Sequence, residues 1–501
     1  MNLWTLVFLL AASTLSAGEK ASSHFEITSL RVSGKIKRVD CSDLDGDGRA
    51  DLLAVYSEGM GSSARRFIGI FWNREGTFSS RPDLVIPIAD ETCAFDLGNV
   101  DSVAGAELIE LSASEVRTRR FRQRQASEAT AVVRQPLFFF SCDREDLPRA
   151  RVVQDLAAPG SDDLLVPGMT SLGIYHRRGD KFEQVGMLKV ELETSLSGSG
   201  LLRTGAQEGE VAAVHASYTF PSIHLIDTDG DGLKDVVLTQ SERIAIYRQR
   251  PGSAFPDQPD SRHDFAVATR EEQEDGSSSS TITVADLDAD GRADFLVHKS
   301  VSKGISSAST SHYLFMARAG GALADKPDQV IRREGSSVTQ ARLLNLHAGG
   351  APVLMVPSVT IGLVSIVRML TSQTLRVNFQ FFPFQPQRRF AKEPRDERTL
   401  SFHLNLSGVS DVQAIDLSGD YNGDGWPDLV FGTGENELSV FLTSKDGTLN
   451  EDPTERLAIR GYGQAVPIRL SDSPRSDLAL FFPDSKGHRG EITVLRNRGG
   501  W

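Results

Sequence analysis

Residues 43–57 read DLDGDGRADLLAVYS, an acidic, glycine-containing turn that runs directly into an apolar stretch with strand preference. The same pattern recurs as DTDGDGLKDVVLTQS at 227–241, DLDADGRADFLVHKS at 286–300 and DYNGDGWPDLVFGTG at 420–434. Weaker copies are GNVDSVAGAELIELS from 98, DLAAPGSDDLLVPGM from 155, NLHAGGAPVLMVPS from 345 and LSDSPRSDLALFFP from 470. An internal repeat therefore organises the chain.

The spacing of the repeat predicts the fold. The first seven turns begin at residues 43, 99, 155, 227, 286, 345 and 420, so the steps between them are 56, 56, 72, 59, 59 and 75 residues. Units of this size, with several short β-rich runs, Gly/Pro turns and no helical periodicity, are typical of four-stranded propeller blades. We predict an all-β fold, a single β-propeller of eight four-stranded blades, with seven blades as the alternative.

The ends of the chain bear on this prediction. Strand candidates at 25–32 and 491–500 make both terminal units look complete, which favours eight blades. An apolar run at 3–12 followed by small residues is typical of a signal peptide, with a buried first strand as the alternative. We expect a signal peptide at 1–18 and the propeller at 19–501. No later apolar run approaches the ~20 residues of a membrane span, so we expect a secreted, periplasmic or cell-surface protein.

The net charge of the chain limits the classes of partner that we expect. The 501 residues include 54 basic and 67 acidic side chains, for a formal net charge of -13. No overall basic field draws the protein onto nucleic acid, so we expect no nucleic-acid partner.

The nine-residue turns 43–51, 227–235, 286–294 and 420–428, which we call the Asp loops, have acidic or amide side chains at positions 1, 3, 5 and 9. Alternate residues of a tight turn present their oxygens on one side, as a hard cation requires, and the carbonyl of position 7 can add another oxygen. A glycine at position 6 permits the bend, with φ > 0 expected. The predicted metal ligands are Asp43, Asp45, Asp47, Arg49, Asp51, Asp227, Asp229, Asp231, Leu233, Asp235, Asp286, Asp288, Asp290, Arg292, Asp294, Asp420, Asn422, Asp424, Trp426 and Asp428.

The ligand set favours Ca²⁺. All-oxygen ligation suits Ca²⁺, whereas Zn²⁺ prefers Cys or His and Mg²⁺ demands a stricter octahedron. The Asp loops hold fifteen acidic side chains, and without them the net charge of -13 would become +2. The competing interpretation is that Asp and Gly only form turns. EF-hands are excluded because position 12 is Ala54, Leu238, Val297 or Phe431 rather than Glu. We expect about four structural Ca²⁺ ions, in blades 1, 4, 5 and 7, and no tight site in the weaker copies.

The pattern apolar-D-x-[DN]-x-DG-x-x-D-apolar, repeated through the chain, resembles the FG-GAP or VCBS repeats of exported, bacterial-type proteins and of the integrin α-subunit propellers. The copy from Gly419, GDYNGDGWPDLVFGTG, is especially similar to the integrin form. The resemblance implies a propeller with Ca²⁺ in these loops. It does not name an activity, since the family includes adhesion propellers and some polysaccharide lyases.

Outside the Asp loops, the sequence contains few candidates for a catalytic or binding site. No HExxH, G-x-S-x-G, Walker or dinucleotide motif is present, and His215 and His224 are best interpreted as structural. Two insertions, at 191–218 and 376–398, are candidates for specificity because binding residues concentrate on loops. The Phe-rich second insertion has two open interpretations, a binding surface or a packed strand. An Arg-rich run at 117–125 is typical of a solvated strand, with an anionic-polymer patch as the alternative.

Three cysteines, Cys41, Cys93 and Cys142, allow at most one intramolecular disulfide. A Cys41–Cys93 pair is conceivable, and unpaired buried cysteines are the alternative.

We therefore predict an exported, Ca²⁺-stabilised propeller that serves as a binding or scaffolding, adhesion-like module for a protein or carbohydrate ligand at the cell surface. A lyase-like, carbohydrate-active enzyme that uses the central funnel is the alternative, and an adhesion subunit that works only in a complex is a third possibility. No catalytic residue is predicted.

Overall fold

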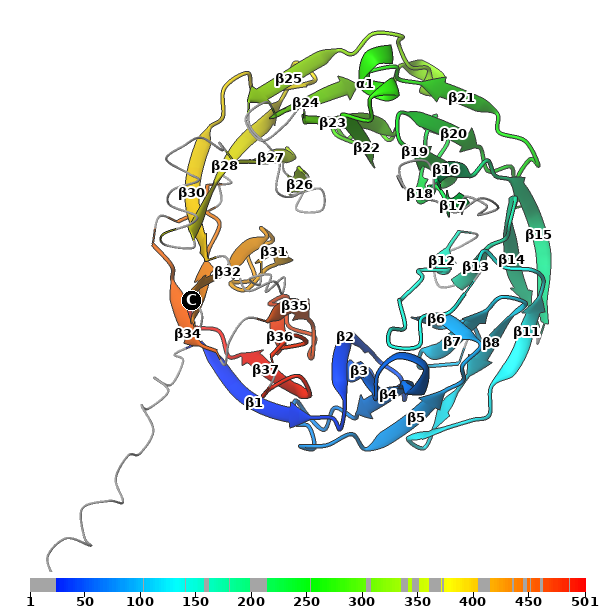
Figure 1. The fold of residues 1–501 in the computed structure, drawn as a ribbon, viewed down its shortest axis with the longest axis vertical. Helices are drawn as coiled ribbons and strands as arrows, with labels where there is room; N and C mark the ends of the chain where they lie inside the picture. Colours follow the sequence, from blue (N-terminus) through cyan, green and yellow to red (C-terminus); the bar gives the residue numbers. More distant parts are fainter. Residues whose placement is uncertain are drawn as a thin grey trace, which may run out of the picture.

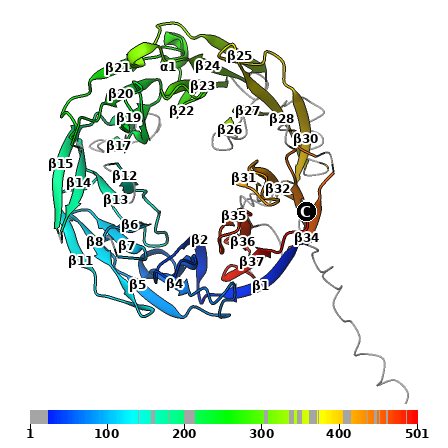
Figure 2. The same cartoon turned by 180° about the vertical axis from the view of Figure 1, so that it is seen from behind.

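The computed structural model is a closed ring of β-sheets, shown from its two sides in Figures 1 and 2. Eight antiparallel blades follow one another around the ring, so the predicted eight-bladed propeller is confirmed and the seven-bladed alternative is wrong. The expected signal peptide at 1–18 lies outside the described residues. The structure describes residues 24–501 except 102, 140, 157–161, 180, 199–213, 253, 303–307, 335–340, 345–350, 360–370, 372–373, 404–414, 435–436, 445–447, 451, 460–462 and 486.

Each blade has four strands, which follow one another from the centre of the ring outward. Blades 1 and 2 consist of β2 (Lys35–Ser42), β3 (Asp51–Glu58), β4 (Arg65–Phe71) and β5 (Leu84–Ile88), then β6 (Thr92–Gly98), β7 (Glu107–Ser112), β8 (Glu115–Arg119) and β11 (Thr130–Arg134). Blades 3 and 4 consist of β12 (Val153–Asp155), β13 (Asp162–Pro167), β14 (Ser171–Arg178) and β15 (Lys181–Lys189), then β18 (Ser222–Ile226), β19 (Asp235–Gln240), β20 (Arg243–Tyr247) and β21 (Ser261–Asp264).

The second half of the ring repeats this order. Blades 5 and 6 consist of β22 (Ser278–Ala285), β23 (Asp294–Ser302), β24 (Ala308–Phe315) and β25 (Gln329–Glu334), then β26 (Arg342–Leu344), β27 (Val353–Ser358), β28 (Thr374–Gln385) and β30 (Asp396–His403). Blades 7 and 8 consist of β31 (Ile415–Gly419), β32 (Asp428–Gly434), β33 (Glu437–Phe441) and β34 (Glu455–Ala458), then β35 (Gln464–Ile468), β36 (Asp477–Phe481), β37 (Glu491–Asn497) and β1 (Phe25–Arg31).

A few elements lie between the blade strands. Three hairpin additions use β9 (Phe121–Arg122) with β10 (Gln125–Ala126), β16 (Glu193–Gly198) with β17 (Val214–Thr219), and β29 (Arg389–Phe390) with the end of β28. The short helices are α1 (Arg270–Glu274), η1 (Gly61–Ser63) and η2 (Ala319–Gly321). None of the helices within the described residues has the length and apolar character that crossing a membrane requires.

The two ends of the chain share one blade. β1 pairs with β37 from Phe25 opposite Asn497 to Arg31 opposite Glu491, so the first strand of the chain is the outermost strand of blade 8. The expectation that each end completes its own unit is therefore wrong. Pairing the two ends closes the ring, which leaves no blade without a neighbour on either side.

The hydrophobic core lies between the blades. Eight clusters of buried side chains fill the eight interfaces, and the cluster between blades 8 and 1 joins Leu52 and Phe71 to Phe481 and Ile492. Because a blade has a neighbour on both faces, its second strand is buried on both, as in β36, where all five residues are buried. The continuous apolar runs after each turn, rather than an alternating pattern, follow from this burial.

One disulfide joins two segments of blade 2. Cys93 at the start of β6 bonds to Cys142 in the connection between β11 and β12, and Cys41 is free. The conceivable Cys41–Cys93 pair is therefore wrong. Cys41 lies in β2 of the neighbouring blade, where burial raises the pKa of its thiol and keeps it protonated.

Candidate metal sites in the Asp loops

The four Asp loops occupy equivalent places in the fold. Each joins the innermost strand of its blade to the second strand: β2 to β3, β18 to β19, β22 to β23 and β31 to β32. Because strand direction alternates in every blade in the same way, all four loops emerge on one face of the ring. The hairpins between third and fourth strands emerge on this face too. We call it the Asp-loop face.

The carboxylate at position 1 shapes each loop by accepting hydrogen bonds from its backbone. In the first loop Asp43 Oδ1 accepts from the N–H of Gly46 at 2.8 Å and Oδ2 from that of Gly48 at 2.9 Å. Asp227, Asp286 and Asp420 accept from the equivalent position 6 amides at 2.7, 2.9 and 2.8 Å. The aspartate thereby folds the turn around its own carboxylate, as Asx turns do.

Positions 4 and 6 have left-handed backbone. The position 6 glycines have φ of 84°, 85°, 79° and 89°, which confirms the expectation for that position. Position 4 is left-handed as well, and in the third Asp loop it is Ala289, with φ of 58°. The third Asp loop, with the sequence DADG, therefore has the same backbone geometry as the loops that have glycine at position 4. Its alanine adopts left-handed backbone at a steric cost, because a Cβ is disfavoured in that conformation.

Positions 5 and 7 are joined in the same way in all four loops. The backbone N–H of position 7 donates to the position 5 carboxylate, from Arg49 to Asp47 at 2.9 Å, and the distances in the other loops are 2.8, 3.0 and 2.9 Å. This bond holds the peptide between positions 6 and 7, next to the peptide that carries the predicted ligand, the carbonyl of position 7.

The position 9 carboxylate connects three segments of its blade. Asp51 Oδ2 accepts from the N–H of Leu44 in the loop at 3.1 Å, and Oδ1 accepts from that of Asn73, beyond the third strand, at 2.8 Å. Asp235, Asp294, Asp428 and Asp477 make the same pair of bonds. Asp477 belongs to the eighth loop, which keeps the nine-residue spacing from 469 to 477 and is not shortened, but which has no acid at positions 1, 3 and 5. The pair of hydrogen bonds at position 9 is therefore independent of the full metal-binding pattern.

Three of the four Asp loops bring three carboxylates together. In each, one oxygen from every member lies within 4.8 Å of the others: Asp43, Asp45 and Asp51; Asp227, Asp229 and Asp235; Asp286, Asp288 and Asp290. Asp47, Asp231 and Asp294 are outside these triads. Among the described residues the loop 420–428 forms no such triad, and its position 3 is the amide of Asn422.

The carboxylate oxygens of the triads are the donors that a hard cation prefers, and two of these oxygens give a specific reason to expect a bound cation. Asp229 Oδ1 and Asp288 Oδ1, both at position 3, are buried and have no hydrogen-bond partner among the described residues. A buried carboxylate oxygen without a partner is costly unless a charge neutralises it. The three triads could therefore hold metal ions.

Burial changes the protonation of the position 9 acids. Burial, together with the carboxylates at positions 1, 3 or 5, raises the pKa of Asp51 to about 6 and the pKa values of Asp294 and Asp428 to about 7. The two accepted backbone N–H bonds oppose this shift. A bound divalent cation would favour the ionised form, so metal and protons compete for these groups.

Sequence reasoning missed a set of carboxamides next to the loops. Asn73 Nδ2 donates to the Leu470 carbonyl of blade 8 at 2.9 Å, Gln249 Nε2 to Leu156 of blade 3 at 3.3 Å and Asn497 Nδ2 to Tyr421 of blade 7 at 2.7 Å. Each carboxamide lies at the end of the third strand of one blade, or two residues beyond it, and reaches position 2 of the preceding blade's loop. The available signal was an Asn or Gln near the end of that strand, in FWN, YRQ and LRN.

The other candidate features have structural roles. The Phe side chains at 379, 381, 382, 384 and 390 are all at most 6% exposed, so the Phe-rich insertion packs in blade 6 and is not a binding surface. The Arg-rich run lies on β8 and the β9–β10 hairpin, where Arg117, Arg119, Arg120 and Arg124 pair with carboxylates. His224 contacts Thr239 Oγ1 at 3.1 Å, and burial lowers its pKa.

Comparison with protein families agrees with this geometry. Residues 227–297, which span the Asp loops of blades 4 and 5, match the family model described as FG-GAP-like repeat. The protein is a β-propeller that carries an FG-GAP-like repeat, and the resemblance seen in the sequence is confirmed. No curated protein matches the chain.

Solved structures with similar folds span most of the chain at low identity. An Agrocybe aegerita lectin that recognises terminal N-acetylglucosamine is 14% identical, with 93% of this chain and 86% of that chain covered and a TM-score of 0.38. The Nup133 β-propeller domain of Vanderwaltozyma polyspora is 10% identical (87% and 98% covered, TM-score 0.38). The V. cholerae biofilm matrix protein Bap1 is 9% identical (95% and 91% covered, TM-score 0.35). These values concern the fold alone.

Proposed function

We propose that the protein is an exported β-propeller that serves as a binding or scaffolding module, with structural Ca²⁺ in the Asp loops of blades 1, 4, 5 and 7. The observation that carries the proposal is the set of three carboxylate triads, two of which include a buried, unpartnered position 3 oxygen. In this proposal Ca²⁺ pins the turn between the first two strands of a blade, and it stabilises the fold because it binds only the folded loop.

Export is part of the same proposal. Residues 1–18 are the signal peptide, and the mature chain reaches a secreted, periplasmic or cell-surface location. The Cys93–Cys142 disulfide supports an oxidising compartment, where such bonds persist.

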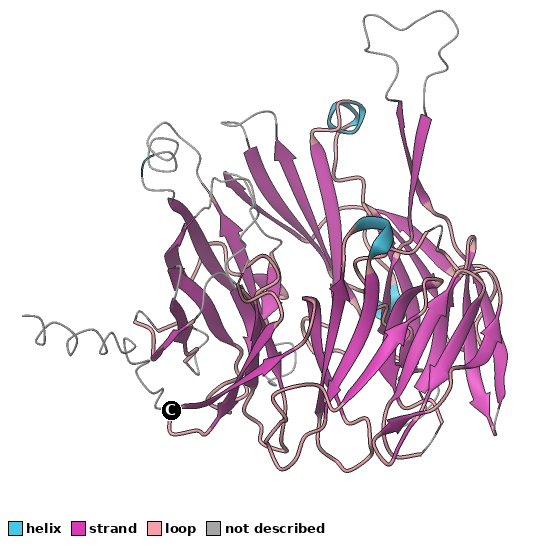
Figure 3. Cartoon of the chain, turned by 60° about the horizontal axis from the view of Figure 1, so that its bottom comes forward, coloured by secondary structure: helices cyan, strands magenta, loops and turns pink. Residues whose placement is uncertain are grey.

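The ligand is proposed to bind on the face opposite the Asp-loop face. The β16–β17 hairpin leaves the outer strand of blade 3 and leads into the inner strand of blade 4, and it projects from that face (Figure 3). Beside it is a polar cleft of about 730 Å³, lined by residues that include Glu193, Glu242 and Ser280. Since the Phe-rich insertion is buried, this hairpin is the insertion that supports a binding role for a protein or carbohydrate ligand.

The metal sites are tested by metal content and by substitution. We expect about four Ca²⁺ per purified mature chain. Asp231→Ala or Asp290→Ala is expected to reduce the Ca²⁺-dependent part of the stability by up to about 2.7 kcal/mol, the contribution of one site at a hundredfold excess of ligand over Kd. The measurement is thermal unfolding with and without Ca²⁺.

Asp163→Ala is the matched control in blade 3, whose turn lacks acids at positions 3 and 5. Asp163 accepts from the Leu156 N–H at 3.3 Å and pairs with His176, so its loss lowers stability overall. The Ca²⁺-dependent increment is expected to stay unchanged. Equal losses of that increment in all three variants would contradict the division into metal-binding and metal-free blades.

A further inference from the structure

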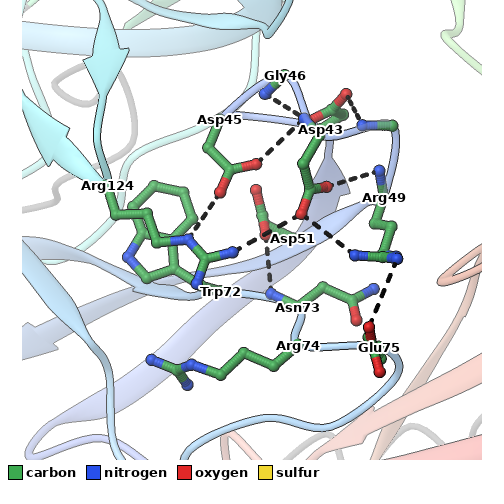
Figure 4. A network of polar contacts seen from close by, with 12 residues as sticks. Asp43, Asp45, Gly46, Arg49, Asp51, Trp72, Asn73, Arg74, Glu75 and Arg124 are labelled. Atoms are coloured by element: carbon green, nitrogen blue, oxygen red, sulfur yellow. Dashed lines mark hydrogen bonds and ion pairs between the residues drawn. The ribbon is translucent and has the colours of Figure 1, made fainter.

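Each Asp loop with a carboxylate triad receives one arginine from outside the loop. Arg124 Nε lies 2.8 Å from Asp45 Oδ2 in the first loop (Figure 4). Arg248 Nε lies 3.3 Å from Asp229 Oδ2 in the loop of blade 4. Arg388 Nε contacts Asp288 Oδ2 in the loop of blade 5, and its second nitrogen lies 3.1 Å from Asp290.

The three arginines contact the same atom of the loop. Arg124 donates a hydrogen bond to Oδ2 of its position 3 aspartate. Arg248 and Arg388 form ion pairs with the same oxygen, although their Nε atoms make no hydrogen bond within the described residues. In all three loops the arginine lies on the Oδ2 side and leaves Oδ1 unpaired with it. In blades 4 and 5 that Oδ1 is buried and unpartnered, and in blade 1 it accepts only a long bond, of 3.3 Å, from the Asp47 N–H. A carboxylate held at one oxygen by a guanidinium has its orientation fixed, and its other oxygen remains available to a ligand.

The loop of blade 7 provides an internal contrast. Its position 3 is Asn422, which carries no charge, and the Asn422 amide donates to Asp424 at 3.0 Å. Among the described ion pairs none involves the acids of this loop. The weaker loop of blade 2 has the same pair, since Arg120 contacts Oδ2 of Asp101 at position 3. In blade 7, Arg475 packs against Gly423 but makes no described ion pair with the acids of the loop. Pairing with an arginine therefore follows the charge at position 3.

Two of the arginines come from the neighbouring blade. Arg124 lies in the β9–β10 turn of blade 2 and reaches the loop of blade 1, and Arg388 precedes β29 of blade 6 and reaches the loop of blade 5. Both have left-handed backbone, with φ of 64° and 58°. Non-glycine residues seldom adopt this conformation, and where they do the surrounding structure or a function maintains it.

We propose that Arg124, Arg248 and Arg388 are positioning residues of the cation sites: each fixes the position 3 carboxylate so that its free oxygen faces the ion. This inference rests on the proposed function, that the Asp loops bind Ca²⁺. Its consequence is that the sites of blades 1 and 5 are complete only when the next blade is docked. Cation binding in the loops of blades 1 and 5 therefore stabilises the contacts of blade 1 with blade 2 and of blade 5 with blade 6. A change in cation affinity at these loops indicates a change in those contacts.

The test uses Tb³⁺ as a luminescent substitute for Ca²⁺ in the mature protein. Trp72 lies beside Asp45 and Arg124 (Figure 4), so excitation of tryptophan sensitises an ion in the first loop. The emission lost in Trp72→Phe is assigned to this site. For that component we expect Arg124→Met to weaken Tb³⁺ binding about tenfold, the lower end of the range for residues that orient metal ligands.

Two controls separate positioning from a general loss of structure. Arg122→Met changes an exposed arginine two residues away in the same hairpin and is expected to leave binding unchanged. The emission component from the loop of blade 7, which contains Trp426, is expected to keep its affinity in Arg124→Met. Far-ultraviolet circular dichroism of both variants is expected to match that of the parent protein.

The outcomes are distinguishable. Unchanged affinity of the first site in Arg124→Met would overturn the positioning role, and tighter binding would show instead that the arginine competes with the cation. Weakening of every site together would also overturn it, since that result reports damage to the ring. If the unsubstituted protein binds neither Tb³⁺ nor Ca²⁺, the proposed function itself fails and the inference with it.

Discussion

Stripping Ca²⁺ from the protein at about pH 8 is expected to remove several kcal/mol of stability, and this loss is expected to shrink as the pH falls to about 5. One site contributes about 2.7 kcal/mol when free Ca²⁺ is a hundredfold above Kd, and in the proposed function four such sites act on one ring. This is the largest effect that the structure predicts. Because each blade has its core in common with its neighbours, loosening four loops is expected to lower the stability of the whole ring.

The pH dependence follows from the position 9 carboxyl groups. In the metal-free fold, burial raises the pKa of Asp51 to about 6 and those of Asp294 and Asp428 to about 7, against an unfolded value of 3.8. Between these values the folded chain holds protons that the unfolded chain releases, so the metal-free protein loses stability as the pH rises from about 4 to about 7. Ca²⁺ binds the ionised groups, so its contribution grows over the same range.

The measurement is calorimetric unfolding of metal-stripped protein, with and without added Ca²⁺, at several pH values. Metal-stripped protein is preferable to a chelator in the sample, because chelators also bind protons. A Ca²⁺-dependent increment that is constant with pH, or larger in acid, would contradict the role of these carboxylates as ligands. If added Ca²⁺ gives no increase in stability at any pH, the Asp loops act only as turns and do not bind Ca²⁺.

Asp477→Ala is expected to cost about 3 kcal/mol or more, with the same loss in the presence and absence of Ca²⁺. Asp477 is 4% exposed and accepts from the N–H groups of Leu470 at 2.9 Å and Asn497 at 2.7 Å. Alanine leaves both buried donors without a partner, and each costs about 1–3 kcal/mol. Asn497, the second donor, lies on β37, which pairs with β1 to close the ring. We therefore expect this substitution to weaken the closure of the ring.

Asp472→Ala in the same turn is the matched control. Asp472 is exposed, and removing an exposed side chain is expected to change stability by less than about 0.5 kcal/mol. The two variants are compared by denaturant unfolding, each with and without Ca²⁺. If Asp477→Ala changes stability as little as the control does, the two hydrogen bonds of the position 9 acid do not stabilise the fold. If the stability loss of Asp477→Ala disappears in metal-stripped protein, the eighth loop binds metal.

Much of the Asp-loop geometry was predictable because it is local. The carboxylate of Asp43 and the amides that it binds lie within five residues of each other, and the left-handed glycine at position 6 follows from the same turn. Short-range geometry of this kind constrains residue type directly, so it recurs as a readable motif in every copy. The number of blades was predictable for a similar reason, since each repeat is one structural unit, with steps of 56 to 59 residues except at the two insertions.

The second bond of each position 9 acid was not predictable. Asp51 binds Asn73, which lies twenty-two residues away, beyond the third strand, and which in turn reaches Leu470 on the other side of the ring closure. The pairing of Cys93 with Cys142, which are forty-nine residues apart, depends on how the connection between β11 and β12 returns to β6. These contacts depend on the lengths of the intervening strands and turns, which sequence patterns do not specify to within one residue.

The sequence by itself therefore determined the repeat, the all-β ring and the local turn geometry of the four Asp loops, because each of these is encoded within one unit. Only the tertiary structure decided which carboxylates meet in triads, that the first strand of the chain completes the last blade, and that Arg124 and Arg388 reach the loops of the preceding blades. Arg124 and Asp45 are seventy-nine residues apart, and nothing in either segment requires the other. They meet because closing a ring brings the turns of consecutive blades together on one face, at distances set by the packing of the blades.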